Sequence, residues 1–230
     1  MIAIISDAHG NYPALKAVLS EIDKLNCGRI ISLGDVSGYY CMVNECIDEF
    51  RRRNIVNLMG NHDYYVLGRG DCPRSYTVNK ITEYQRKVIT PENLKYLEES
   101  SLGIDDGFIS ARHGGWNDPI DEYIDVFDFA NTVGRKEKIF CSGHTHVQGM
   151  VRDKEVVYFN PGSVGQPRDF DSRAAYAVIH DDGAVELRRV EYNIDEIAKA
   201  MNEAGFEERT YSCLYSGERI GGNPKQSRQS

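Results

Sequence analysis

Short apolar runs alternate with helix-like patterns along the first third of the chain. Residues 1–6 are mostly apolar, and aliphatic side chains then recur at helical spacing up to Leu25. This change of period indicates a strand followed by an amphipathic helix. Asn11 is a candidate cap for that helix, and Pro13 suits its first turn. The same alternation predicts strands at 29–33 and 55–59 and a helix at 43–53. Alternating strands and helices favour a largely parallel sheet covered by helices.

The pattern changes in the second half of the chain. Residues 78–100 are polar with a helical period and predict a pair of covering helices. Beyond Gly107, short apolar runs predict a second, mostly antiparallel sheet with strands at 108–111, 138–141, 156–159, 174–179 and 184–190. Residues 194–206 predict a closing helix, so we expect one domain over residues 1–206. Residues 207–230 are polar enough to predict a poorly ordered tail.

Length, charge and cysteine content limit the classes of function. A chain of 230 residues suits a single core. A net charge of −8 argues against general binding to nucleic acid or acidic membranes, so a phosphate-bearing ligand needs local positive charge. The six cysteines form no CxxC pair, which indicates reduced thiols. The N-terminal apolar run is too short for a signal peptide and no stretch is long enough to span a membrane, so we expect a cytoplasmic protein. The sequence is compatible with a homo-oligomer as well as with a monomer.

Most of the histidines lie in short polar clusters that directly follow an apolar run. The exception is His180, which we expect in a hairpin turn, and Asp35 follows a further run in the same way. Sheet-based enzymes build their sites at the ends of strands. The clusters are Asp7-Ala8-His9, Gly60-Asn61-His62-Asp63, Arg112-His113-Gly114 and Gly143-His144-Thr145-His146.

The spacing within the clusters supports metal ligation. Residues i and i+2 of an extended segment point the same way, so Asp7 and His9 can face one point, as can His144 and His146. Asp35 has two oxygens with which it could bridge two ions. Each cluster alone has an ordinary structural explanation, such as a turn or a helix cap. Their joint occurrence after successive strands favours a metal site.

The order of these clusters resembles the signature of the calcineurin-like metallophosphoesterase superfamily. The resemblance covers about residues 1–190, including the loop at 160–168, which is similar to that of small bacterial and archaeal members. It implies a four-layer α/β fold in which helices flank two packed mixed sheets. It also implies two divalent ions, the first held by Asp7, His9 and His146, the second by Asn61, His113 and His144, with Asp35 bridging both. Manganese is the metal expected from the resemblance, with iron, zinc and nickel as alternatives.

The same resemblance implies a mechanism for hydrolysing a phosphate ester. Water activated by the two ions attacks phosphorus, and a protonated His62 faces the substrate as general acid. Asp63 either orients His62 or caps the following turn. Arg168 either clamps the phosphate or forms a surface pair with Asp169 or Asp171.

Residues around the motifs suggest the type of substrate. The segment Asp35-Val36-Ser37-Gly38-Tyr39 lacks the arginine that phosphoprotein phosphatases carry there and is similar to compact prokaryotic phosphodiesterases. Tyr39 and Trp116 flank the motif loops and are candidate substrate contacts. We therefore expect a phosphodiester or nucleotide-type small molecule as substrate. The alternatives are a phosphomonoesterase and a non-catalytic protein-binding scaffold of the same fold; the presence of His62 and of every ligand position argues against the scaffold.

Overall fold

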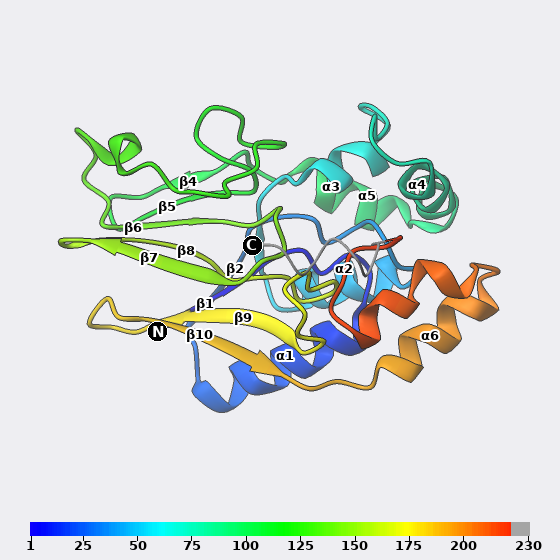
Figure 1. Cartoon of the computed structure of the whole chain (residues 1–230). Helices are drawn as coiled ribbons and strands as arrows, with labels where there is room; N and C mark the ends of the chain where they lie inside the picture. Colours follow the sequence, from blue (N-terminus) through cyan, green and yellow to red (C-terminus); the bar gives the residue numbers. More distant parts are fainter. Residues whose placement is uncertain (222–230) are drawn as a thin grey trace.

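The computed structural model describes residues 1–221, which form two mixed five-stranded sheets flanked by helices (Figure 1). The first sheet has the strand order β10-β9-β1-β2-β3. Its parallel strands are the ones expected from the alternating pattern near the N-terminus. Their bounds are β1 Ile2–Ile5, β2 Arg29–Ser32 and β3 Val56–Asn57, and they are joined by β9 Ala174–Ile179 and β10 Val185–Val190.

The second sheet corrects two of the expectations from sequence. Its order is β4-β5-β6-β8-β7, and the pairs β5–β6 and β6–β8 are parallel, so the sheet is not mostly antiparallel. Strand β9 pairs antiparallel with β1 and therefore extends the first sheet, because all its residues are buried and need a central place. The bounds are β4 Ile104–Asp105, β5 Ile109–Arg112, β6 Ile139–Ser142, β7 Gly149–Asp153 and β8 Val156–Asn160.

The first sheet has apolar residues on both faces, as a sheet between two layers requires. Ala3 and Ile5 of β1 pack with the cluster formed by α1 and α2, whereas Ile4 faces the second sheet. This alternation follows from the two-residue period of a strand. The helices are α1 Tyr12–Leu25, α2 Val43–Arg52, α3 Asn61–Val66, α4 Tyr76–Val88, α5 Pro91–Glu98 and α6 Ile194–Glu203.

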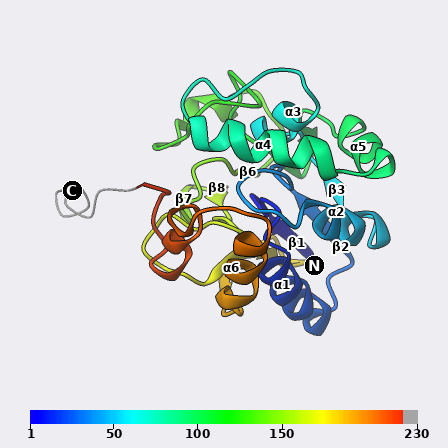
Figure 2. The ribbon, with the colours of Figure 1, turned by 90° about the vertical axis from the view of Figure 1, so that its right-hand side faces the viewer.

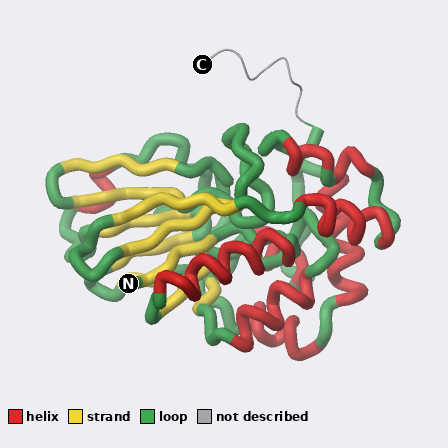
Figure 3. Tube along the Cα trace, turned by 90° about the horizontal axis from the view of Figure 1, so that it is seen from below, coloured by secondary structure: helices red, strands yellow, loops and turns green. Residues whose placement is uncertain are grey.

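Helices α1 and α2 pack against one face of the first sheet, and α3 follows the carboxyl end of β3. Seen from below, the strands lie toward one side of the molecule and most of the helices toward the other, with loops between them (Figure 3). Helices α3, α4 and α5 lie together, on the opposite side of the molecule from α6 (Figure 2). Asn11 caps α1 as expected, because its Oδ1 accepts a hydrogen bond from the Ala14 amide at 3.3 Å. Within residues 1–221, every helix falls short of the length and apolar character needed to cross a membrane.

The chain after α6 is more ordered than its composition suggests. Glu208–Thr210 and Ser212–Tyr215 form short 3₁₀ helices, and Cys213 and Leu214 are buried. Leu214 packs in a cluster with Tyr40 and with Met201 of α6. The expectation of a poorly ordered tail therefore does not hold for residues 207–221, and the remainder of that tail, 222–230, lies outside the described residues.

Replacing Leu214 tests whether this segment is packed against the domain. Leu214 is 1% exposed, so Leu214→Ala should lower the free energy of unfolding by about 2–5 kcal/mol in urea denaturation. Leu102 is 53% exposed, and Leu102→Ala serves as the matched control with an expected change of about 0.5 kcal/mol or less. Equal stabilities of the two variants would contradict the packing.

Candidate metal centre

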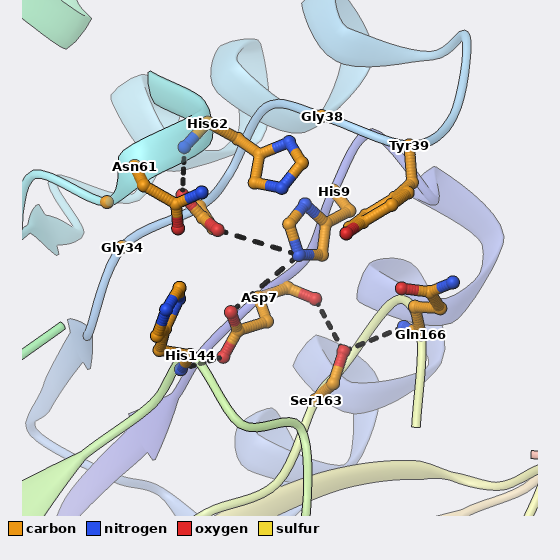
Figure 4. A network of polar contacts seen from close by, with 12 residues as sticks. Asp7, His9, Gly34, Gly38, Tyr39, Asn61, His62, His144, Ser163 and Gln166 are labelled. Atoms are coloured by element: carbon orange, nitrogen blue, oxygen red, sulfur yellow. Dashed lines mark hydrogen bonds and ion pairs between the residues drawn. The ribbon is translucent and has the colours of Figure 1, made fainter. Parts of the chain in front are cut away.

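The candidate ligands converge where the strand ends of the two sheets meet (Figure 4). Parallel pairing places the ends of β1 and β2 side by side, and likewise those of β5 and β6. The loop after β1 is hydrogen-bonded to the loop after β2, with the Asp7 amide 3.0 Å from the Gly34 carbonyl oxygen. The amide of His9 similarly donates to the Asp35 carbonyl oxygen at 2.9 Å. The fold thus brings together residues that are far apart in the sequence.

Most of the candidate ligands have an unusual backbone conformation. A positive φ is uncommon for residues other than glycine and is often found at functional sites. The extended geometry assumed from sequence for the Asp-x-His and His-x-His pairs is therefore wrong, although the side chains still converge. The residues and their φ values are Asp7 55°, His9 51°, Asp35 55°, His144 64° and His146 62°.

The ligand atoms form two neighbouring groups. In the first, His146 Nε2 lies 3.0 Å from His9 Nε2 and 3.2 Å from Asp7 Oδ1. In the second, His113 Nε2 lies 3.4 Å from Asp35 Oδ2, and His144 completes the group. Asn61 adds its Oδ1 at 3.1 Å from His113 Nε2. His144 and His146 thus face different groups rather than one point.

Asp35 lies between the two groups. Its Oδ2 is 3.7 Å from His9 Nε2 in the first group and 3.4 Å from His113 Nε2 in the second. Its Oδ1 accepts a hydrogen bond from the His62 amide at 2.8 Å. The backbone therefore holds one oxygen of this carboxylate and leaves the other facing both groups.

Unsatisfied polar atoms show that the centre suits divalent cations. Asp7 Oδ1, Asp35 Oδ2 and His144 Nε2 are buried without a hydrogen-bond partner among the described residues. Such orphan atoms are costly in a folded protein, and a bound cation would satisfy them. Nitrogen and oxygen donors without thiolate suit manganese, iron or zinc. The residues present thus fit the ions implied by the sequence, and ion binding itself stays a prediction.

Hydrogen bonds to the backbone orient three of the histidine rings. The Nδ1 atoms of His9, His113 and His146 lie 2.8, 3.0 and 2.7 Å from the carbonyl oxygens of Ser37, Leu33 and Gln166, respectively. A carbonyl oxygen only accepts, so each Nδ1 carries the proton. In its neutral form, each ring then directs the lone pair of Nε2 into the centre, as metal ligation requires.

The charge states of the centre follow from burial and from its two carboxylates. Burial lowers the pKa of His9, His146 and His144, the last to about 2, so these rings are neutral. Burial alone would raise the pKa of Asp7 and Asp35, but the neighbouring histidines outweigh it and keep both ionised.

His113 differs from the other rings of the centre. Burial opposes its charged form, but the nearby Asp35 carboxylate raises the pKa of His113 to about 9. A cation that binds at Nε2 must therefore displace a proton, as metals generally do at protonated ligands. The protonated form of His113 partly balances the negative charge of the two carboxylates.

His62 lies beside the centre and lines the cavity above it. Its ring centroid is 4.7 Å from that of His9 and 4.6 Å from that of Tyr39, and its Nδ1 is buried without a hydrogen-bond partner among the described residues. Burial lowers the pKa of His62 to about 4, against the opposing effect of Asp35. The expected protonated ring is therefore not the resting state of the ligand-free protein.

Asp63 holds backbone rather than the His62 ring. Its Oδ2 accepts hydrogen bonds from the amides of Asp35 at 2.9 Å and Gly60 at 3.3 Å. Its Oδ1 accepts from the amide and hydroxyl of Ser37 at 3.0 and 2.7 Å. Of the two roles expected for Asp63, these contacts correspond to the cap, and they also position the loop that carries Asp35.

Arg168 and Tyr39 line a cavity of about 370 Å³ that opens from the centre. Arg168 Nη2 donates to the Tyr39 hydroxyl at 2.8 Å and to Gln166 Oε1 at 3.0 Å. The alternative of a surface pair is wrong, because Asp169 pairs with Arg189 and Asp171 with Arg173. Among residues 1–221, Arg168 has no carboxylate partner, so its charge is available to a ligand.

Trp116 is not part of this cavity. Its indole nitrogen donates to Ser110 Oγ at 2.8 Å, and its ring packs with Phe127 and Phe140 outside the second sheet. The expected substrate contact by Trp116 is therefore not supported, since Tyr123 occupies the cavity wall with its ring centroid 4.1 Å from that of His144. Nothing in the sequence around Tyr123 distinguishes it, because its loop has no motif or regular period.

The loop that follows β8 supports the metal centre through hydrogen bonds to the loops that carry the ligands. The roles of its individual residues were not predicted from the sequence. Ser163 Oγ donates to the Asp7 carbonyl oxygen at 2.8 Å and accepts from the Gln166 amide at 2.7 Å. Asn160 Nδ2 donates to the Gly143 carbonyl oxygen at 2.7 Å, which fixes the loop before His144. The Asn-Pro-Gly-Ser sequence is the feature from which this supporting role could have been predicted.

Comparison with known proteins identifies the family. The Calcineurin-like phosphoesterase superfamily domain matches residues 1–183, so the chain belongs to this superfamily. The protein MJ0912 of Methanocaldococcus jannaschii, described as uncharacterized, is 36% identical over 217 residues, which are 84% of this chain and 88% of that protein. Family membership and the histidine–aspartate cluster together support metal-dependent hydrolysis of a phosphate ester.

Solved structures confirm the expected fold. A metallophosphoesterase from Sphaerobacter thermophilus is 32% identical with a TM-score of 0.82, covering 94% of this chain and 99% of that chain. The hypothetical protein PH1004 from Pyrococcus horikoshii is 18% identical with a TM-score of 0.78, covering 95% of this chain and 100% of that chain. The second likeness is one of fold alone.

Replacing Gly38 tests the fit of the two imidazoles beside it. A Cβ at this position would lie 2.5 Å from His9 Nδ1 and 2.6 Å from His62 Nδ1, where φ is +107°. Gly38→Ala should weaken manganese binding about tenfold or more in calorimetry, because it displaces the bond that orients His9. Gly107→Ala is the control, since φ is +84° there and a Cβ would meet nothing within 4 Å. Equal affinities in the two variants would contradict the account.

Proposed function

We propose that this protein hydrolyses a small phosphodiester or a nucleotide-type ester with the help of two divalent ions, manganese being the expected metal. The observation that carries the proposal is the position of Asp35 Oδ2, which is buried, without a hydrogen-bond partner among the described residues, and directed toward both ligand groups. Asp7, His9 and His146 would hold one ion. Asn61, His113 and His144 would hold the other, with Asp35 shared.

The bound ions would supply positive charge and activate water for attack on phosphorus. The residues around them then bind the ester and complete the proton transfer. Arg168 hydrogen-bonds non-bridging oxygens of the phosphate, and Tyr39 and Gln166 hold its guanidinium in place. His62 donates a proton to the leaving oxygen. It takes up that proton with the substrate, whose negative charge favours the imidazolium form.

Two features favour a diester over a phosphoprotein. Ser37 and Gly38 follow Asp35 at the place where phosphoprotein phosphatases carry an arginine, by the resemblance described above. The cavity of about 370 Å³ is also lined by Tyr39 and Tyr123, whose rings could contact the second ester group of a diester. A phosphomonoesterase remains the alternative within the same chemistry.

The net charge and the cysteines support a small-molecule substrate and a location in the cytoplasm. A net charge of −8 disfavours general nucleic-acid or membrane partners and leaves a small molecule as the substrate. All six cysteines are free, which suits the reducing cytoplasm. A protein-binding scaffold would need neither His62 nor an intact set of ligand positions.

Removal and return of metal tests the proposed reaction. Metal-stripped protein should lack activity, and manganese should restore cleavage of bis(p-nitrophenyl) phosphate at a higher rate than that of p-nitrophenyl phosphate. The expectation rests on the buried oxygens of Asp7 and Asp35 that have no hydrogen-bond partner among the described residues, which bound cations would satisfy. Preference for the monoester would favour a phosphatase. No activity on either compound after reloading would favour the scaffold.

Replacing His62 separates proton transfer from metal binding. His62→Ala should lower kcat by about a hundredfold to ten-thousandfold, because a positioned general acid contributes on that scale. Its manganese content, measured by elemental analysis, should stay that of the wild type. His180→Ala is the matched control, since His180 lies in the distant hairpin and contacts Glu186. Unchanged turnover in His62→Ala would remove this residue from the mechanism.

A further inference from the structure

The segment after α6 forms one wall of the cavity over the metal centre. Arg209, Thr210 and Arg219 line it, together with residues of the motif loops such as Asp35 and His62. The buried Leu214 anchors this segment, and the Phe170 amide donates to the Gly217 carbonyl oxygen at 3.0 Å. The wall lies outside residues 1–183, which match the superfamily domain, so it is a feature that the shared catalytic motifs do not specify.

The cavity has the opposite charge to the rest of the protein. Among the described residues 1–221, its lining contains four arginines, at positions 74, 168, 209 and 219, and a single carboxylate, Asp35, which belongs to the metal centre. The whole chain carries a net charge of −8. Positive charge concentrated in one cavity of an acidic protein attracts an anionic ligand, and low-dielectric walls strengthen the effect.

The arginines differ in whether their guanidinium groups are paired with a carboxylate. Arg74 is paired with Asp121, and Arg209 lies 2.7 Å from Glu207 in a pair that is well exposed and therefore weak. Arg219 has no hydrogen-bond or ion-pair partner among residues 1–221. The wall after α6 thus presents a free guanidinium and a weakly paired one.

The free charges come from two different segments of the chain. Arg168 adjoins the metal centre, since its amide donates to the His146 carbonyl oxygen at 3.1 Å and its guanidinium contacts Tyr39. Arg209 and Arg219 belong to the wall after α6. The scissile phosphoryl group is served by the ions and Arg168, so the wall has charge to spare for another anion. The fork of an arginine matches phosphate oxygens.

We propose that the substrate carries a second phosphoryl group besides the scissile one, and that Arg209 and Arg219 bind it. This inference rests on the proposed function, because it assigns the scissile group to the metal centre. It makes the segment after α6 a determinant of specificity, while the motif loops determine the chemistry. Substrates with a single phosphoryl group would contact the metal centre and Arg168 but not Arg209 and Arg219.

A pair of ligands that differ by one phosphate tests the second site. Dissociation constants of thymidine 5′-monophosphate and thymidine 3′,5′-bisphosphate are measured by calorimetry on manganese-loaded protein. Wild type should bind the bisphosphate about tenfold more tightly, as expected for charge-assisted hydrogen bonds. The double variant Arg209→Gln/Arg219→Gln should reduce that ratio to about twofold or less. Arg152→Gln, at an exposed position on β7 outside the cavity, should keep the wild-type ratio.

Equal binding of the two ligands by wild type would overturn the second site, as would an unchanged ratio in the double variant. An equal loss of affinity for both ligands would also overturn it, since that indicates general damage. The p-nitrophenyl 5′-esters of the same two compounds report hydrolysis separately. If wild type with manganese cleaved neither ester, the proposed function would fail, while the ratio of dissociation constants would still decide the second site.

Discussion

The main constraint on the structure is the burial of two carboxylates, Asp7 and Asp35, where the strand ends of the two sheets meet. Their burial is energetically unfavourable unless positive charge lies nearby. Each has one oxygen held by hydrogen bonds from the protein and one oxygen without a hydrogen-bond partner among the described residues. An isolated buried carboxylate is strongly unfavourable, so the arrangement is stable only with nearby positive charge. The protonated form of His113 provides part of that charge, and divalent cations would provide the rest.

Much of the surrounding structure serves to hold these groups in place. The left-handed backbone at Asp7 and Asp35 is costly and needs support from its neighbours. Asp63 supports the loop after β2 through the amides of Asp35 and Ser37, and Ser163 supports the loop after β1. The strained backbone of these loops thus lowers the stability of the fold, and in return it keeps the ligand atoms close together.

The sequence predicts the fold class and the convergence of the candidate ligands, but not the pairing of every strand. Carboxylate, amide and imidazole side chains after successive strands are a local signal, so Asp7 and His146 could be identified without knowing how the strands pair. The place of β9 beside β1 depends on pairing between distant residues, and no local pattern determines such pairing. Trp116 was assigned to the cavity by its nearness to His113 in sequence, but packing with Phe127 turns it away. The wall that carries Arg219 was missed because its polar composition concealed the buried Leu214.

The position of bound metal tests the central claim most directly. Crystals of the protein soaked in manganese would be measured at a wavelength where manganese scatters anomalously. The account predicts two peaks, one among Asp7, His9 and His146 and the other among Asn61, His113 and His144, with Asp35 between them. A single peak, or peaks away from these residues, would contradict the assignment of a two-metal centre to this site.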